Sequence, residues 1–345
     1  MALNIKDVLK ELCEIPGPSG FEEEVVLRAN KFMKPYMDET WVDTLGNLIG
    51  VKKCGKSGAK KLLIDAHIDE IGFVVTAIEE GFLKFSALGG LDARLLPSAG
   101  VTVMTDPAID GVVCVLPPHV LKPEDTDKII SIDDLYIDVG LSQKEAERRI
   151  PVGTAGVLTS STRDFGENQI CSKALDNRAG FAAIIGALEL IKDESLDVDI
   201  YVMASVQEEV GLRGAGPGVF AISPDYCIVV DAGEAKTPDA TEYEIPEKMG
   251  SGVIVARGPN MNKAFTDRII SLAENKSINH QITVIPGGYS GTNTKEIQVS
   301  QCGVATAFIS IPVKYIHSAN EVVQIDDIES AIKLLSETIM SMKGA

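Results

Sequence analysis

The sequence predicts an α/β fold in which a mixed, mostly parallel sheet lies between helices and is interrupted by a small β-rich domain. Two observations predict this fold. Strand-like and helical segments alternate in residues 1–71 and again in residues 159–345, which is typical of a parallel or mixed sheet covered by helices. Residues 72–158 instead hold short β-rich segments, punctuated by Gly and Pro at near-regular spacing. We therefore expect one large domain (1–71 and 159–345) with an inserted domain (72–158).

The N-terminal part of the large domain predicts two helices, a hairpin and a buried strand. Ser19 followed by Glu22 has the spacing of a capping box, and an apolar helical face follows it. Residues 40–53 predict a hairpin that turns at Gly46-Asn47. The short apolar run KLLIDAH (61–67) has the character of a strand buried on both faces.

The rest of the chain follows the same logic. The insert carries one predicted helix, SQKEAERRI, introduced by Ser142 as its cap. After the insert, residues 177–192, 262–276 and 326–340 have helical periodicity. The strand-like segments DVDIYVMASV, YCIVVDA and TAFISIP alternate with these helices. This alternation is what predicts the sheet of the large domain.

Composition and charge exclude several classes of protein. Of the 345 residues 45% are hydrophobic and 24% charged, as in an ordinary globular protein. The net charge of −18 argues against nucleic-acid binding, which needs a basic surface. No apolar run approaches the about 20 residues of a membrane span, and the N-terminus does not have the pattern of a signal peptide. Six scattered cysteines favour a reduced, cytoplasmic protein.

Acidic and imidazole side chains follow three of the predicted strands. His67 and Asp69 come at the end of the first, Glu208 and Glu209 directly after the second, and Asp231 at the end of the third. Ligands of open α/β sheets bind beyond the carboxyl ends of the strands, so these side chains are candidates for a binding site. Each also has an ordinary explanation alone: a solvated loop, exposed charge or a turn.

Two further candidates lie outside the strand ends. Asp176 in ALDNR most simply caps the following helix, and His317 in KYIHSANE has the alternative of an ordinary surface histidine. The joint occurrence of all these candidates favours a site for two metal ions. Such ions lie about 3.5–4 Å apart and need a bridging carboxylate with imidazole and carboxylate ligands on each side. Of the four histidines, two lie in such motifs. Asp69 is placed to accept the second ring N–H of His67.

The six segments AHIDEIGF, ALDNR, VQEEVGLRGA, VVDAG, SGTNT and YIHSANE resemble, in this order, the signatures of the tetrahedral (TET) aminopeptidases. These are di-metal glutamyl and deblocking aminopeptidases, some of which carry endoglucanase names. The resemblance runs from about Val8 to Met340, and VQEEVGLRGA is its most specific part. It implies a zinc-peptidase-like fold for the large domain and a barrel- or PDZ-like insert used for dimerisation.

The resemblance also implies a role for each candidate residue. His67 and Asp231 would hold one divalent ion, Glu209 and His317 the other, and Asp176 would bridge them. Glu208 would be the general base and Asp69 would orient His67. The ions would be zinc or cobalt, with manganese as a further option, and the substrates would be short peptides. Relatives assemble dimers into a tetrahedral dodecamer, His119 would be structural or interfacial, and the Asp176–Asn177 bond would be cis.

Other functions stay open at this stage. An acylase or a carboxypeptidase would use the same ligands, because the metal centre serves amide hydrolysis in general. An endoglucanase needs two opposed carboxylates and leaves His67 and His317 without a role. A non-enzymatic protein would not need the full ligand set. Two segments depart from the family pattern, VVDAGEAKTPDATE and GGYSGTNTKE, the latter with Asn293 where an aspartate is common. The preferred N-terminal side chain is therefore not predicted.

Overall fold

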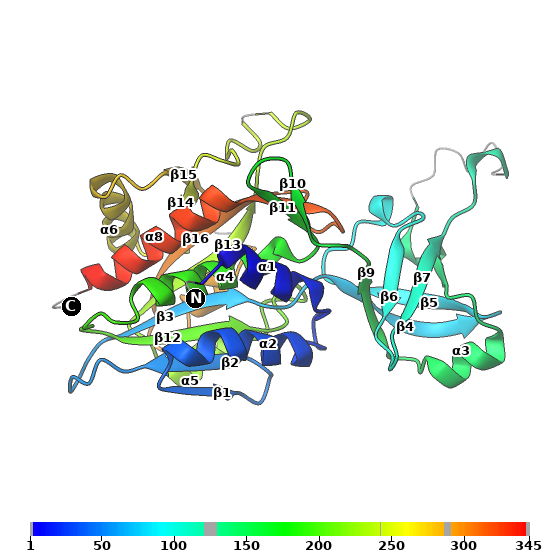
Figure 1. The fold of residues 1–345 in the computed structure, drawn as a ribbon, viewed down its shortest axis with the longest axis horizontal. Helices are drawn as coiled ribbons and strands as arrows, with labels where there is room; N and C mark the ends of the chain where they lie inside the picture. Colours follow the sequence, from blue (N-terminus) through cyan, green and yellow to red (C-terminus); the bar gives the residue numbers. More distant parts are fainter. Residues whose placement is uncertain (1–2, 121–129, 242, 286–290, 343–345) are drawn as a thin grey trace.

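The computed structural model describes residues 3–120, 130–241, 243–285 and 291–342. A large α/β body occupies one end of the molecule and a small β body the other (Figure 1). No helix among these residues is long and apolar enough to cross a membrane.

The large body is built on an eleven-stranded mixed sheet. Its main path runs in the order β1 (Glu39–Val42), β2 (Leu48–Lys52), β12 (Asp199–Ser205), β3 (Lys61–His67), β13 (Tyr226–Glu234), β16 (Ala305–Lys314), β17 (Glu321–Gln324), β11 (Gln169–Ser172) and β10 (Arg163–Phe165). β14 (Val253–Arg257) pairs with β16 and with β15 (His280–Val284). The central strands β12, β3, β13 and β16 run parallel. The predicted fold class is therefore confirmed.

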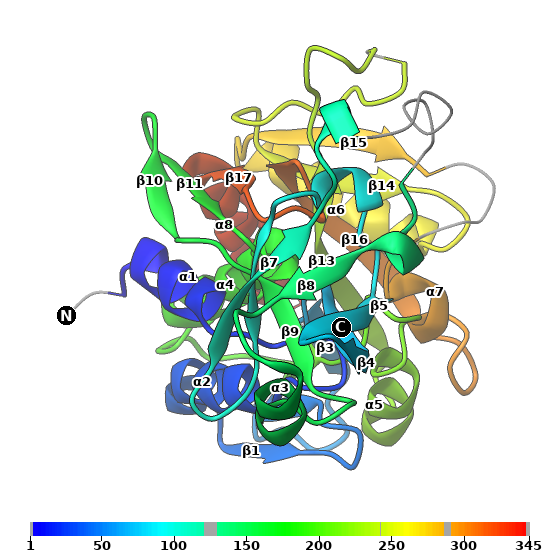
Figure 2. The ribbon, with the colours of Figure 1, turned by 90° about the vertical axis from the view of Figure 1, so that its right-hand side faces the viewer.

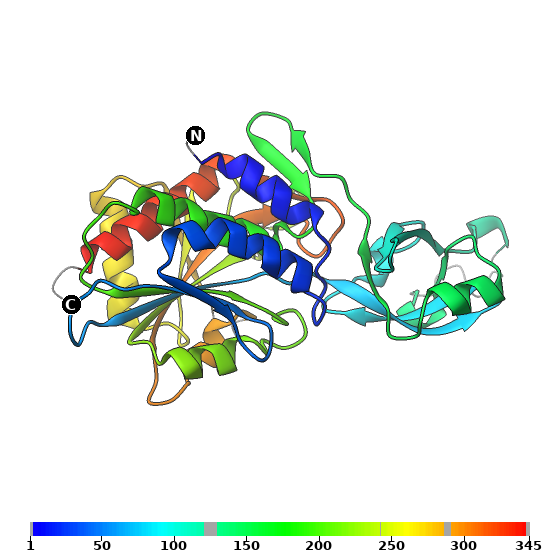
Figure 3. The same cartoon turned by 60° about the horizontal axis from the view of Figure 1, so that its bottom comes forward.

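Helices cover both faces of this sheet (Figure 3). One face packs against α1 (Ile5–Glu14), α2 (Glu23–Met33), α4 (Leu175–Leu190), α6 (Lys263–Asn275) and α8 (Ile325–Ser341). The other packs against α5 (Ala215–Ile222) and the short α7 (Thr294–Ile297). Because both faces are covered, β3 is buried along almost its whole length. This burial explains why KLLIDAH is a continuous apolar run with little alternation.

The small body is a closed antiparallel barrel, seen from its own side in Figure 2. Its strands follow the order β4 (Gly72–Glu79), β5 (Phe82–Leu88), β8 (Tyr136–Asp138), β7 (Ile109–Cys114), β6 (Gly100–Val103) and β9 (Ala155–Leu158). Alternate side chains fill its interior, among them Phe73 and Phe85, whose rings meet edge to face. α3 (Gln143–Arg149) begins with the capping box of Ser142 and Glu145.

One local prediction is confirmed and another is wrong near the N-terminus. β1 and β2 form the expected hairpin around Gly46-Asn47. The capping box of Ser19 and Glu22 does not form. Ser19 instead donates its hydroxyl to Asp69, 2.6 Å away, and α2 begins at Glu23 with Glu22 as its N-cap residue. The box fails because the helix starts four residues after Ser19, and Glu22 instead accepts the backbone N–H of Gly20 at 2.8 Å.

Candidate metal centre

Three neighbouring parallel strands bring their carboxyl ends to one edge of the sheet. His67 ends β3 and lies opposite Ser205, the last residue of β12, so that Glu208 follows close to it. β13 runs on the other side of β3 and carries Asp231. The strand order, which the sequence does not reveal, is what places these three side chains together.

Asp176 and His317 reach the same place from other elements. Asp176 lies at the start of α4, where it and Asn177 have non-helical backbone angles and are joined by a cis peptide bond, as expected. His317 follows β16 with a left-handed backbone, φ 63°. All five expected ligands and Glu208 therefore line one pocket of about 460 Å³.

The carboxylate of Asp176 lies between the two imidazoles. Its Oδ1 is 3.1 Å from Nε2 of His67, and its Oδ2 is 3.5 Å from Nε2 of His317. Each imidazole has a second carboxylate beside it. Asp231 Oδ1 lies 3.4 Å from Nε2 of His67, and Glu209 Oε2 lies 3.2 Å from Nε2 of His317. The arrangement has two halves that share Asp176.

Glu208 lies in the first of these halves. Ligand atoms of His67, Glu208 and Asp231 lie within 4.8 Å of one another, and those of His67, Asp176 and Glu209 form a second such group. The adjacent glutamates thus reach different halves of the site. Their separation follows from adjacent residues at a strand end pointing to different sides.

Asp69 supports the cluster from behind. Its Oδ1 lies 3.4 Å from Nδ1 of His67 and accepts the backbone N–H of Glu208 at 3.0 Å. Its Oδ2 accepts the backbone N–H of Glu209 at 3.2 Å and the hydroxyl of Ser19. Asp69 therefore holds the backbone of the glutamate pair as well as the imidazole of His67. Sequence reasoning expected only the contact with His67.

The side chains of the cluster shift one another's protonation. Burial raises the pKa of Glu208 to about 10, with His67 opposing the shift and Asp231 adding to it. Burial also raises the pKa values of Glu209 and Asp231. The hydrogen bond with Glu209 raises the pKa of His317 to about 9. Several buried carboxyl groups therefore share only two imidazoles, those of His67 and His317, as partners that can carry a positive charge.

This donor set fits divalent cations. Imidazole nitrogens with carboxylate oxygens are ligands that zinc and similar ions take, and a catalytic site leaves a coordination position for water. A nearby cation would also oppose the burial and the neighbouring carboxylates that raise the pKa of Glu208. The side chains thus match a divalent cation both in the types of ligand atom and in their grouping into two sets.

Two residues at the site were missed by the sequence analysis. Gly90, in the segment after β5 of the barrel, lines the pocket directly against His317. Glu321 accepts the backbone N–H groups of both Asp176 and His317. Glu321 lies in the segment YIHSANE, but nothing in its spacing indicates contact with Asp176, 145 residues earlier.

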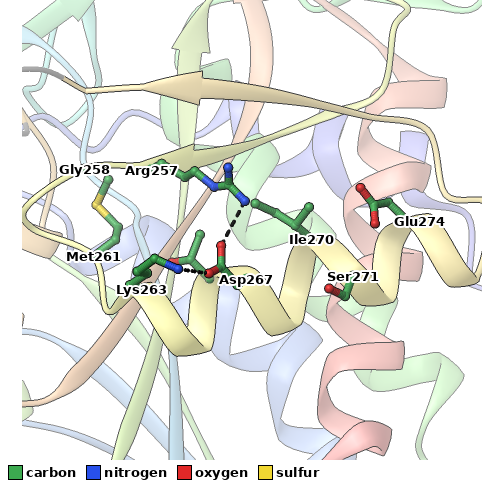
Figure 4. Close-up of a pocket in the computed structure, with 9 residues that line it drawn as sticks. Arg257, Gly258, Met261, Lys263, Asp267, Ile270, Ser271 and Glu274 are labelled. Atoms are coloured by element: carbon green, nitrogen blue, oxygen red, sulfur yellow. Dashed lines mark hydrogen bonds and ion pairs between the residues drawn. The ribbon is translucent and has the colours of Figure 1, made fainter.

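A second pocket, against α6, has a different character (Figure 4). Asp267 projects into it and is paired with Arg257 at 2.9 Å and with Lys263. These charges neutralise one another at the surface, and no imidazole is among the described residues that line this pocket. We therefore take the cluster at the strand ends as the functional site.

The chain is similar to known proteins over almost its whole length. The family model of the M42 glutamyl aminopeptidases matches residues 46–334. The lysyl aminopeptidase of Pyrococcus furiosus is 33% identical over 346 residues, covering 98% of this chain and 97% of that protein. The TET aminopeptidase of a marine sediment archaeon of the Thaumarchaeota superposes with a TM-score of 0.93 at 33% identity, covering 98% and 96% of the two chains.

A further solved structure is the TET1 peptidase of Pyrococcus horikoshii, which can assemble into a tetrahedron or a large octahedral shell. Its TM-score is 0.83 at 30% identity, with 97% of this chain and 99% of that chain covered. Fold and site together define the present chain as a peptidase. It belongs to the M42 glutamyl aminopeptidase family, and the resemblance to the TET aminopeptidases is thereby confirmed.

Proposed function

We propose that the chain is a di-metal aminopeptidase that removes N-terminal residues from short peptides. The observation that carries this proposal is the position of the Asp176 carboxylate, one oxygen facing His67 and the other facing His317. A carboxylate between two imidazoles is what a bridging ligand of a two-metal centre requires. Membership of an aminopeptidase family supports the reaction class.

The grouping of the side chains into two halves supports a ligand assignment. In the proposal His67 and Asp231 hold one ion, Glu209 and His317 hold the other, and Asp176 bridges. The ions are divalent, zinc or cobalt, with manganese as the third option. Asp69 fixes the ring of His67, since metal-bound histidine donates its other ring N–H to such a partner.

Divalent ions held by these residues would lower the pKa of a bound water and would polarise the scissile carbonyl. Glu208 then acts as general base: its carboxylate takes a proton from the attacking water and returns it to the leaving amine. The backbone N–H of Glu208 is fixed by Asp69 at 3.0 Å, which limits the positions that its carboxylate can take. Only 8% of Glu208 is exposed, which limits the contact of this side chain with bulk water.

Alternative reactions are less well supported. An acylase or a carboxypeptidase would use the same metal centre, but the matching family and the relative from Pyrococcus furiosus are named as aminopeptidases. No aromatic side chain is among the described residues that line the pocket, as a sugar platform of an endoglucanase would need. That activity would also leave both imidazoles unused.

We further propose that the barrel, residues 72–158, is a domain through which the chain dimerises, and that dimers assemble into a tetrahedral dodecamer. Exposed apolar side chains on the barrel support a contact surface, namely Val112, Val115, Leu116 and Val120. Light scattering tests it: the mass should be twelve times 36.9 kDa. All six cysteines are free, which fits the cytoplasmic location that we propose.

The activity is tested with aminoacyl anilides of Leu, Glu and Lys, on chelator-treated and on Zn²⁺- or Co²⁺-loaded protein. We expect hydrolysis in the loaded samples and none after chelation. N-acetylated versions of the same anilides serve as the control, because an aminopeptidase needs a free amino group. Release of acetate from the acetylated compounds would identify an acylase, and release of their aromatic amine would identify an amidase that needs no free amino group. No hydrolysis of any compound would remove the proposal.

A further inference from the structure

Glu321 connects two parts of the metal centre that are far apart in the chain. Its Oε1 accepts the backbone N–H of His317 at 2.9 Å. Its Oε2 accepts the backbone N–H of Asp176 at 3.0 Å. One carboxylate therefore fixes the main chain of two candidate ligands at once, and neither of these contacts uses the ligands' own side chains.

The position of Glu321 makes this connection rigid. Glu321 is the first residue of β17, lies opposite Ser172 in β11, and is only 2% exposed. The chain continues from β11 through Lys173 to Asp176. Glu321 and Asp176 are therefore both held close to the same pair of strands, β17 and β11. No lysine or arginine forms an ion pair with Glu321 within the described parts of the chain. Burial raises the pKa of Glu321 well above its ordinary value, and the two backbone N–H groups of Asp176 and His317 oppose that shift.

The two carboxylate oxygens of Glu321 accept hydrogen bonds from residues with irregular backbone conformations. His317 has a left-handed backbone, and Asp176 lies at the irregular start of α4. Neither N–H is part of a helical or sheet ladder, so Glu321 supplies the partner that a buried N–H requires. A shift of either main chain would change the distance between Asp176 Oδ2 and Nε2 of His317, now 3.5 Å.

We propose that Glu321 is a positioning residue that sets the geometry of the half of the metal centre formed by Glu209 and His317. This inference rests on the proposed two-metal function and deepens it. Glu321 touches no reacting atom and holds no ion; it acts through the main chain of two ligands. Outer partners of this kind typically contribute about 10- to 100-fold to metal affinity.

The substitution Glu321→Gln tests the proposal, because the side chain keeps its size but has one acceptor oxygen in place of two. Its NH₂ group must face one of the two backbone N–H groups, and that hydrogen bond is lost. Chelator-treated protein is titrated with Zn²⁺ against a chromogenic chelator to obtain both dissociation constants. His317→Ala and His67→Ala variants show which constant belongs to which half.

We expect Glu321→Gln to weaken the ion at the Glu209 and His317 half by about 10- to 100-fold. The other half is linked to Glu321 only through the shared Asp176, so its loss should be smaller. Combined with His317→Ala, Glu321→Gln should add no further loss, because the half on which it acts is already lost. Equal losses at both halves, or wild-type affinity at both, would overturn the proposal.

Asp327→Asn is the matched control. Its carboxylate also accepts two backbone N–H groups, from Gly250 at 2.6 Å and Gly252 at 2.7 Å, but it contacts no candidate ligand. This variant should keep both affinities. If Asp327→Asn lost as much metal affinity as Glu321→Gln, any disturbed buried carboxylate would weaken metal binding. That result would overturn the specific role of Glu321.

Two outcomes separate this inference from the proposed function. Wild-type protein that binds two ions while Glu321→Gln binds both equally well sinks the inference alone. Wild-type protein that binds fewer than two ions sinks both. If Glu321→Gln does not fold, Glu321→Asp replaces it, since the shorter side chain cannot reach both N–H groups. Wild-type affinities in that variant count against the proposal.

Discussion

Gly90 lies directly against the imidazole ring of His317. A Cβ atom at Gly90 would come within 2.5 Å of Nδ1 and 2.9 Å of Cε1 of that ring. A Cβ atom at the preceding residue, Gly89, would come within 3.0 Å of Cβ of Glu209. The segment that follows β5 of the barrel therefore covers one half of the metal centre. The absence of side chains at these two positions is what lets the main chain approach the candidate ligands.

Gly90→Ala should displace His317, because a contact of 2.5 Å is too short for any real Cβ atom. We expect kcat/KM to fall by about 10- to 100-fold at limiting metal and to recover in part with excess Zn²⁺. Gly216→Ala is the control, since a Cβ atom there meets nothing within 4 Å. A Gly90→Ala enzyme with unchanged kcat/KM at limiting metal would show that His317 can move without consequence.

Glu208→Gln and Glu209→Gln should separate the roles of the adjacent glutamates. Glu208→Gln removes the base, so kcat should fall by about 10²- to 10⁴-fold while two ions remain bound. Glu209→Gln removes a ligand, so metal content should fall with activity. Elemental analysis of both variants after dialysis measures this difference. A metal-free Glu208→Gln with a metal-loaded Glu209→Gln would reverse the assignment.

The sequence predicted the strand-end part of the site better than the rest. His67, Glu208 and Asp231 end or follow apolar strands, and parallel strands place such ends at one edge. Asp176 and His317 come from irregular segments, so only the family resemblance indicated them. The spacing of apolar residues predicts helices and strands, but it does not predict where irregular segments lie in the folded chain.

Contacts through the main chain could not be predicted at all. Glu321 acts on backbone N–H groups, and Gly90 acts through the absence of a side chain. For Ser19 the local pattern was misleading. It predicted a helix cap, but the hydroxyl of Ser19 donates a hydrogen bond to Asp69, 50 residues away. Asn293 stands where the family pattern commonly has an aspartate. It is buried and donates to Asp65 and Ser205, while residues 286–290 of the same loop lie outside the described part.

A buried ion cluster beside the site should matter for stability. Glu70 accepts from Lys173 at 2.7 Å and from Arg178 at 3.0 Å, and all three side chains are buried. Arg178 also donates to the carbonyl groups of Leu12 and Ile15, which end α1. The cluster thus joins α1 to the segments that carry His67 and Asp176.

Glu70→Gln should lower the free energy of unfolding by about 3–5 kcal/mol, because two buried cations lose their counter-charge. Urea unfolding of the chelator-treated protein measures this loss independently of metal binding. Lys263→Gln, which breaks an exposed pair with Asp267, should leave the urea midpoint unchanged. Equal midpoints for Glu70→Gln and wild type would show that the cluster contributes no net stability.

The last prediction concerns pH and a carboxylate away from the metal centre. Burial raises the pKa of Asp327 from 3.8 to about 6, with the N–H groups of Gly250 and Gly252 opposing the shift and Asp326 adding to it. Between these two values the folded state binds more protons than the unfolded chain. The free energy of unfolding contributed by Asp327 therefore falls as pH rises from about 4 to 6, and stays constant above that.

Asp327→Asn lacks this titration, so the difference in unfolding free energy between wild type and variant isolates it. We expect that difference to fall between pH 4 and pH 7 by up to about 3 kcal/mol, and to be flat from pH 7 to 8. Urea unfolding of both proteins at each pH measures the difference, and the contributions of all other titrating groups cancel. A difference that grows with pH would mean that the N–H groups of Gly250 and Gly252 outweigh burial. In that case the carboxylate would stabilise the start of α8 in its charged form.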